Sequence, residues 1–175
     1  TLVDVGAFST YLNLANASAG SCTLIPDGTN GPYPGDGSNG PNVLTTSGVV
    51  RRDLKSSFGS FSGSATGVPL TLRMRATDVS DGGNPKAGLA IYAWHCDSQG
   101  RYSLYSNGVT DQNWLRGVQV TDANGWVRFD TIWPGCYDGR WPHIHFEVYP
   151  SAAKATSAAN KLRTSQIAMP AAQSK

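Results

Sequence analysis

The alternation of apolar and polar residues over residues 68–77 constrains the fold of this chain more than any other feature. Every even position from Val68 to Ala76 is apolar, and the odd positions are mostly polar. Successive side chains of a β-strand point to opposite faces of a sheet, so this period of two predicts a strand with one buried face. We therefore expect a sheet that covers a core on one side.

Four further segments have strand patterns, and residues typical of turns separate them. The segment 89–96 is apolar on both faces, which predicts a strand in the centre of a sheet. Residues 143–149 alternate between an apolar face and a face that carries two histidines, a glutamate and a tyrosine. The other predicted strands are residues 117–121 and 126–133, with weaker ones near residues 49–54 and 165–169.

Length and composition favour a single all-β domain over residues 1–175. The chain has 20 Gly and 10 Pro but only 15% charged residues, a usage that favours short strands and many turns over long helices. Several antiparallel strands joined by short turns predict a β-sandwich with long loops and little helix. Residues 1–20 are weakly patterned. Residues 26–48 predict a long ordered loop, because apolar residues flank them.

Charge and hydropathy argue against two classes of partner. The net charge is only +2 and the basic residues are scattered, whereas a nucleic-acid groove needs a clustered basic face. No apolar run approaches the length of a membrane span, so we expect neither nucleic acid nor membrane as a partner. The chain begins at Thr1 without Met or a basic segment. Secretion would explain such a start, and so would a cloning boundary.

The pair His143 and His145 is the strongest candidate for a binding site. In an extended strand both imidazoles lie on one face, where they can bind zinc, copper or iron. An ordinary surface pair of histidines would have the same spacing. Tyr137 precedes this strand and Tyr102 follows the segment 89–96. Because a free phenol has a pKa of about 10, it binds only a strong Lewis acid at neutral pH, and Fe(III) is the usual one.

Glu147 lies on the same face as the two histidines, one strand step further along. From its position it could be a third metal ligand, or a hydrogen-bond partner of an imidazole. His95, in contrast, is expected to be a buried, hydrogen-bonded structural histidine without a role as a ligand.

The segment 125–137, followed by Arg140 and residues 143–145, resembles the core of the intradiol ring-cleavage dioxygenases. This family includes the catechol, protocatechuate and hydroxyquinol dioxygenases. The chain resembles a small, secreted form without the N-terminal helical domain of the catechol dioxygenases. The other matching segments are residues 22–26, 31–33, 51–54, 94–103, 115–117 and 162–167.

The resemblance implies one non-haem Fe(III) ion per chain, with hydroxide in a fifth position. Its ligands would be Tyr102, Tyr137, His143 and His145. The implied reaction cleaves catechol-type diols with O2 between the two hydroxylated carbons, and gives cis,cis-muconate-type diacids. The expected partners are therefore small catechols and O2, and a monomer is favoured over an oligomer.

The resemblance also implies catalytic and substrate-binding residues. Arg140 would stabilise negative charge on the substrate ring, and Tyr137 would leave the metal as a base. Gln166 would hydrogen-bond either Arg140 or the reacting oxygen. The substrate would contact Tyr33, Trp133 and Cys136 as well as Arg140.

Three cysteines, Cys22, Cys96 and Cys136, leave at least one thiol unpaired within a monomer. In an extracellular protein the preferred disulfide is Cys22–Cys96, because Cys136 adjoins the candidate site. Three buried free thiols fit the composition equally well.

Two other functions are compatible with the sequence. A non-catalytic β-sandwich module could bind carbohydrate or a partner through exposed tryptophans. A dioxygenase-like protein could also have a repurposed metal site. Iron content and oxygen uptake with catechols would separate these alternatives from the enzyme.

Overall fold

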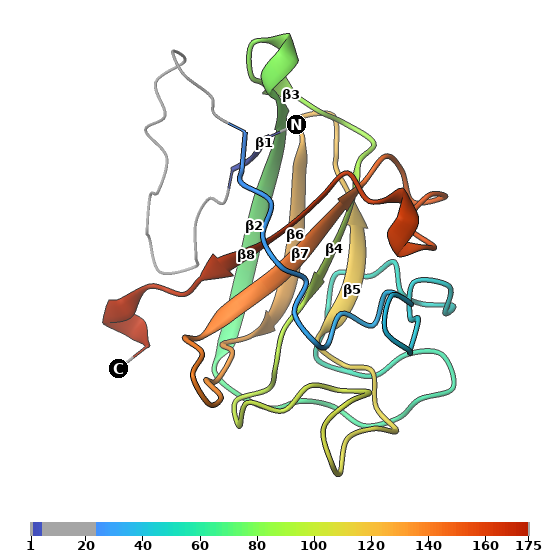
Figure 1. Cartoon of the computed structure of the whole chain (residues 1–175), viewed down its shortest axis with the longest axis vertical. Coiled ribbons are helices and arrows are strands. Elements are labelled where there is room, and N and C mark those ends of the chain that lie inside the picture. Colours follow the sequence, from blue (N-terminus) through green and yellow to red (C-terminus); the bar gives the residue numbers. More distant parts are fainter. Residues whose placement is uncertain (1, 5–23, 175) are drawn as a thin grey trace.

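The predicted strands form two antiparallel sheets in the computed structural model, which describes residues 2–4 and 24–174 (Figure 1). In the first sheet, β2 lies between β1 on one side and β3 and β6 on the other. The second sheet has the order β5-β4-β7-β8. The first sheet contains β1 (Leu2–Asp4), β2 (Pro69–Asp78), β3 (Asn84–Pro85) and β6 (Trp126–Ile132); the second contains β4 (Ala90–Trp94), β5 (Arg116–Val120), β7 (His143–Tyr149) and β8 (Arg163–Ala168).

Helix is confined to three short 3₁₀ turns in the described part of the chain, as the all-β prediction requires. They are η1 (Val79–Asp81), η2 (Ala158–Asn160) and η3 (Ala171–Gln173). Within residues 2–4 and 24–174, none of these turns has the length and apolar character needed to cross a membrane.

The main hydrophobic core lies between the two sheets and follows the predicted alternation. The even residues of β2 from Leu70 to Ala76 are buried there. They pack together with the apolar face of β7, which carries Ile144, Phe146 and Val148. The period-two patterns of β2 and β7 are therefore confirmed, and β4 is central as predicted because it pairs with both β5 and β7.

A second cluster of buried side chains covers the opposite face of β4 and β7. Tyr92, Trp94 and Tyr149 come from these strands, and loop residues such as Val43 and Tyr102 pack over them. Because of this cover, all seven residues of β7 are buried. The face with the polar side chains is therefore enclosed, and this enclosure makes a buried site possible.

The loop over residues 26–48 is ordered and contributes to this cover, as expected. The segment from residue 24, blue in Figure 1, passes across β7 and β8. Gly28 N donates to Thr164 O at 2.9 Å, and Ser165 Oγ donates to Pro26 O at 3.3 Å. These bonds hold the loop to the outer edge of the second sheet.

The prediction of a strand over residues 49–54 is wrong. This segment makes only isolated parallel bridges, one from Val50 to Val118 of β5 and one from Asp53 to Asp130 of β6. It thus contacts one strand in each sheet and forms a continuous ladder with neither. The weaker strand predicted near residues 165–169 is present as β8.

Truncating one buried leucine should test the core between the sheets. Leu72 is 3% exposed in this core, whereas Leu162 is 47% exposed. We expect Leu72→Ala to lower the free energy of unfolding by about 2–5 kcal/mol, and Leu162→Ala by less than about 0.5 kcal/mol. Urea denaturation measures both values, and similar losses in the two variants would contradict the assigned core.

Candidate metal centre

Four side chains converge on one point beside β7: Tyr102, Tyr137, His143 and His145, which we call the four-residue cluster. The two histidine Nε2 atoms are 3.0 Å apart. The hydroxyl oxygens of Tyr102 and Tyr137 lie 3.5 and 3.4 Å from Nε2 of His143, and 3.5 Å from each other. A metal ion about 2.0–2.2 Å from each N or O ligand holds neighbouring ligand atoms about 2.8–3.8 Å apart at angles of about 90–120°. The measured separations therefore fit a shared metal ion.

The positions of the tyrosines depend on the close approach of two loops. Tyr102 lies in the loop after β4, and Tyr137 in the turn before β7. Gly100 has φ +80°, and a Cβ atom there would lie 2.5 Å from the Cys136 carbonyl oxygen. A residue without a side chain is needed at this point, because any other residue would push the two loops apart.

The two imidazoles are held in different ways. Nδ1 of His143 lies 2.5 Å from the Trp141 carbonyl oxygen. That oxygen only accepts, so Nδ1 carries the proton and the lone pair of Nε2 points into the cluster. The ring of His145 stacks on Trp94 with centroids 4.9 Å apart and planes at 7°. Its Nδ1 has no hydrogen-bond partner among the described residues, so packing rather than hydrogen bonding orients this ring.

Burial opposes a charge on three of the potential ligands in the metal-free protein, His143, His145 and Tyr102. Removal from water lowers the pKa of His143, and lowers that of His145 to about 3, so both imidazoles are unprotonated at neutral pH. Burial and the hydrogen bond with Tyr137 raise the pKa of Tyr102. A strong Lewis acid is therefore needed to displace its proton.

The chemistry of the donor set favours Fe(III) over softer or more weakly acidic metals. In the part of the chain that the structure describes, no group of three or more His, Cys, Asp or Glu side chains could hold a metal ion. A metal centre here would thus need the two tyrosines as ligands. Two phenol oxygens with two neutral imidazoles fit Fe(III), because this ion is acidic enough to bind phenolate at neutral pH.

Arg140 and Gln166 lie at the rim of the four-residue cluster. Nη2 of Arg140 is 3.4 Å from Nε2 of His143 and donates a hydrogen bond to Oε1 of Gln166. Nε2 of Gln166 donates to Thr29 O at 2.9 Å. Gln166 thus joins Arg140 to the long loop, while the catalytic roles of both residues stay predictions.

The three other candidate substrate-binding residues lie in different surroundings. The ring of Tyr33 packs on that of Tyr102, with centroids 4.8 Å apart. Trp133 is half-buried and packs against the core between the sheets. Cys136 is exposed. Tyr33 is therefore brought to the cluster, and the contacts of Trp133 and Cys136 with substrate stay predictions.

Both interpretations of Glu147 are wrong. Its Oε2 accepts a hydrogen bond from the Tyr149 hydroxyl at 2.6 Å, and its Oε1 accepts one from Lys161 Nζ at 2.9 Å. Burial raises the pKa of this carboxyl group to about 7. Glu147 is one strand step too far from the candidate ligands, so its carboxylate bonds to these neighbours and not to the four-residue cluster.

His95 is a buried structural histidine, as predicted. Its Nδ1 lies 2.7 Å from Cys96 O and its Nε2 lies 2.7 Å from Oγ1 of Thr131. The carbonyl only accepts, so Nδ1 donates to it and Nε2 accepts from the threonine hydroxyl. Both nitrogens are used within the fold, which leaves none for a metal.

The disulfide prediction stays untested because Cys22 lies outside the described residues. Among the described residues Cys96 is buried and has no disulfide partner; its Sγ lies 3.4 Å from Gly135 O, and burial raises the pKa of its thiol to about 12. The alternative of three buried thiols is wrong, because Cys136 is exposed.

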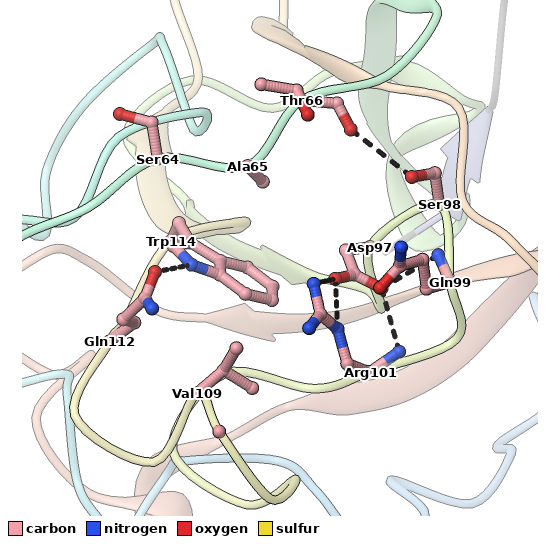
Figure 2. Close-up of a pocket in the computed structure, with 11 residues that line it drawn as sticks. Ser64, Ala65, Thr66, Asp97, Ser98, Gln99, Arg101, Val109, Gln112 and Trp114 are labelled. Atoms are coloured by element: carbon pink, nitrogen blue, oxygen red, sulfur yellow. Dashed lines mark hydrogen bonds and ion pairs between the residues drawn. The ribbon is translucent and has the colours of Figure 1, made fainter.

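A polar pocket of about 200 Å³ lies behind the Tyr102 loop and is distinct from the four-residue cluster (Figure 2). Its wall includes Asp97, whose carboxylate forms an ion pair with Arg101 at 2.7 Å and accepts from the backbone N–H groups of Gln99 and Arg101. These bonds fix the turn that leads into Tyr102. The lining residues are Ser64, Ala65, Thr66, Asp97, Ser98, Gln99, Arg101, Gly108, Val109, Gln112 and Trp114.

The tryptophans give little support to a carbohydrate-binding module. All five lie within the described residues, and only Trp141 is largely exposed. Its indole N–H donates to Met169 O at 2.8 Å. A sugar-binding platform needs several exposed aromatic rings, and the described residues present only one largely exposed tryptophan.

Sequence comparison matches residues 40–164 to a family model described as dioxygenase. Chlorocatechol 1,2-dioxygenase of Rhodococcus opacus is 36% identical over an alignment of 84 residues, and the match covers 42% of this chain and 33% of that protein. The protocatechuate 3,4-dioxygenase beta chain of Burkholderia cepacia is 34% identical over an alignment of 96 residues, and the match covers 47% of this chain and 41% of that protein. The matched part thus spans less than half the length of these relatives.

Two solved structures are similar over most of the chain. The intradiol ring-cleavage dioxygenase from Tetranychus urticae has a TM-score of 0.67 at 26% identity, and the match covers 87% of this chain and 68% of that one. The dioxygenase domain of a dioxygenase carbohydrate-binding fusion from Streptomyces sp. SirexAA-E has a TM-score of 0.52 at 26% identity, with coverage of 83% and 75%.

Substituting Gly100 should test the contact between the two loops. Gly108 is a matched control, because its φ is +82° and a Cβ there would meet nothing within 4 Å. Alanine at either position costs about 1–2 kcal/mol of backbone strain. Only Gly100→Ala adds a clash with Cys136 O, so we expect it also to lower iron affinity by at least about tenfold. Chelator competition measures this affinity, and equal affinities in the two variants would contradict the proposed contact.

Acid should destabilise the protein in part through His95. Burial lowers the pKa of this imidazole from 6.5 to about 4 in the folded state. Between these values the unfolded chain binds the proton and the folded chain does not. The free energy of unfolding therefore decreases as the pH is lowered from about 6.5 to about 4. From pH 7 to pH 5 the loss should be about 2 kcal/mol greater in the wild type than in His95→Gln. Denaturation curves at several pH values measure this loss of stability. Parallel pH profiles of the wild type and His95→Gln would refute the prediction.

Proposed function

Because the chain belongs to the intradiol ring-cleavage dioxygenase family, we propose that it cleaves catechol-type diols with O2 between the two hydroxylated carbons. The products would be cis,cis-muconate-type diacids. The observation that supports this proposal is the convergence of two phenol oxygens and two imidazole nitrogens in the four-residue cluster. These residues would hold one Fe(III) ion.

Bound Fe(III) would act as a Lewis acid on the catechol oxygens and draw electron density from the ring, which allows the ring to react with O2. The residues of the chain supply the orientation, the bases and the surrounding charge. The neutral imidazoles keep their Nε2 lone pairs available because burial opposes their protonation.

Tyr137 is the better placed of the two phenols to accept a proton from the substrate. Tyr102 is only 1% exposed and its ring packs on Tyr33. Tyr137 is half-buried and lies in a turn in which Gly139 has φ +72°. A catechol must lose two hydroxyl protons to chelate a metal, and the oxygen of Tyr137 can take one of them.

Arg140 provides a permanent positive charge beside the cluster. Its guanidinium lies next to His143 and is held by the carboxamide of Gln166. A fixed cation here would stabilise negative charge that develops on the ring and oxygens of the substrate. Gln166 would position Arg140, because it also bonds the Thr29 carbonyl of the loop.

Purified protein loaded with Fe(III) should be red and should consume O2 with a catechol. We expect Tyr137→Phe to remove much of the tyrosinate-to-iron absorption and to lower kcat by about 10²-fold or more. Tyr105→Phe is the matched control, because Tyr105 is half-buried and its hydroxyl bonds Gly35 N and Asn39 outside the cluster.

Visible spectroscopy and an oxygen electrode with catechol, protocatechuate and hydroxyquinol measure these effects. A colourless protein with stoichiometric zinc and no oxygen uptake would exclude the proposed function. Full colour and activity in Tyr137→Phe would show that the ligand assignment is wrong.

A further inference from the structure

Arg116, on β5, has a fully buried guanidinium that forms no ion pair with any Asp or Glu side chain of the described residues. All three of its nitrogen atoms donate to neutral oxygen atoms instead. Nε donates to Ser103 Oγ at 3.0 Å and Nη2 to Ser103 O at 2.9 Å. Nη1 contacts Tyr33 O and Pro34 O, both at 3.0 Å, and the Tyr92 hydroxyl at 3.2 Å. A buried cation without an anion is expensive, so it needs this full set of acceptors.

These acceptors lie on three segments that build the candidate metal centre. Ser103 directly follows Tyr102, so the two bonds to Ser103 hold the loop that carries a candidate ligand. The carbonyl groups of Tyr33 and Pro34 belong to the loop whose tyrosine ring packs on Tyr102. Arg116 therefore joins two loops that are about seventy residues apart in sequence at the point where they meet the cluster.

The third acceptor links Arg116 to a candidate histidine ligand through stacked rings. The hydroxyl of Tyr92 receives the bond from Arg116 and donates to Pro34 O at 2.7 Å. The Tyr92 ring stacks on Trp94 with centroids 4.9 Å apart, and Trp94 stacks on His145 at the same distance. The stacking on Trp94 therefore supports the His145 ring from the side of β4, while Tyr102 and His143 contact it edge-on.

Close packing leaves no room for Arg116 to move away from these segments. A Cβ atom on Gly35 would lie 2.9 Å from Nη1 of Arg116, and Gly35 has φ +63°. The guanidinium also lies 5.4 Å from the centroid of the Tyr105 ring. The loop backbone thus closes directly over the cation, which fixes both its position and that of the loop.

We infer that Arg116 is a positioning residue for the candidate metal centre. It locks the Tyr33–Pro34 and Tyr102–Ser103 segments together, and its unpaired positive charge lies against Ser103, the residue that directly follows the candidate ligand Tyr102. The inference rests on the proposed function for the identity of the metal. The locking of the two loops can be measured in the metal-free protein.

Two substitutions separate the geometry of Arg116 from its charge. Arg116→Met removes both, and Arg116→Lys keeps the charge but loses the forked set of donors. Arg51→Met is the matched control. Arg51 is half-buried, and its guanidinium donates to the carbonyl groups of Asp53 and Ser56, which lie outside the two loops. Ser103→Ala removes one acceptor and serves as the milder test if Arg116→Met does not fold.

Hydrogen exchange of the metal-free variants tests the locking of the loops. Arg116→Met should raise exchange in residues 31–36 and 102–106 by at least about tenfold, because lost bonds to a charged donor are worth this much or more. Exchange in β2 and β6 should stay close to that of the wild type, and Arg51→Met should change neither loop. Unchanged loops, or an equal rise across the whole chain, would overturn the inference.

The absorption of the iron-loaded variants tests the charge. A cation near the phenolate stabilises its electrons, so its loss should move the tyrosinate-to-iron band to lower energy in Arg116→Met. Arg116→Lys should keep the band nearer its wild-type position while its loops still exchange faster. Equal band shifts in the Lys and Met variants would overturn the role of the charge. If the wild type itself binds no iron, the proposed function fails, and the exchange result still decides whether Arg116 locks the loops.

Discussion

Burial of strand β7 on both faces is the constraint on which the site depends. One face packs in the core between the sheets through Ile144, Phe146 and Val148. The other face places His143 and His145 under loops that exclude water. Because the apolar face fixes the register of the strand, a slip by one residue would move the histidines into the core. The sandwich core therefore sets the position of the candidate metal ligands as well as the stability of the fold.

The second cluster of buried residues, on the outer face of β4 and β7, differs from the first because it contains many polar groups. Arg116 donates a hydrogen bond to the Tyr92 hydroxyl, which donates to the Pro34 carbonyl of the loop. The carboxylate of Glu147 accepts hydrogen bonds from Tyr149 and Lys161. Hydrogen bonds of this kind between buried side chains and loop carbonyl groups restrict the conformations of the loops. They help to explain why long loops of Gly, Pro and Asn are ordered here and can carry candidate ligands with fixed spacing.

The sequence predicted the main strands because they depend on local patterns, and the four residues that the family resemblance implied lie together in the structure. A period of two identifies β2 and β7, and the flanking motif identifies Tyr102 and Tyr137. Arg116 and the stacking of Trp94 on His145 could not be predicted, since they arise from contacts between strands and loops far apart in sequence. The predicted roles of Glu147 were wrong for the same reason, because its partner Lys161 lies more than ten residues beyond the end of the strand.

The distribution of charge explains which kind of substrate this site would prefer. In the metal-free cluster, burial keeps the two imidazoles unprotonated and Tyr102 un-ionised. With Fe(III) bound to two phenolates it would carry one net positive charge, and Arg140 and Arg116 add two permanent ones nearby. An excess of positive charge in a buried site favours a ligand that binds as an anion. A catechol that loses both hydroxyl protons on binding meets this condition, whereas a neutral sugar does not.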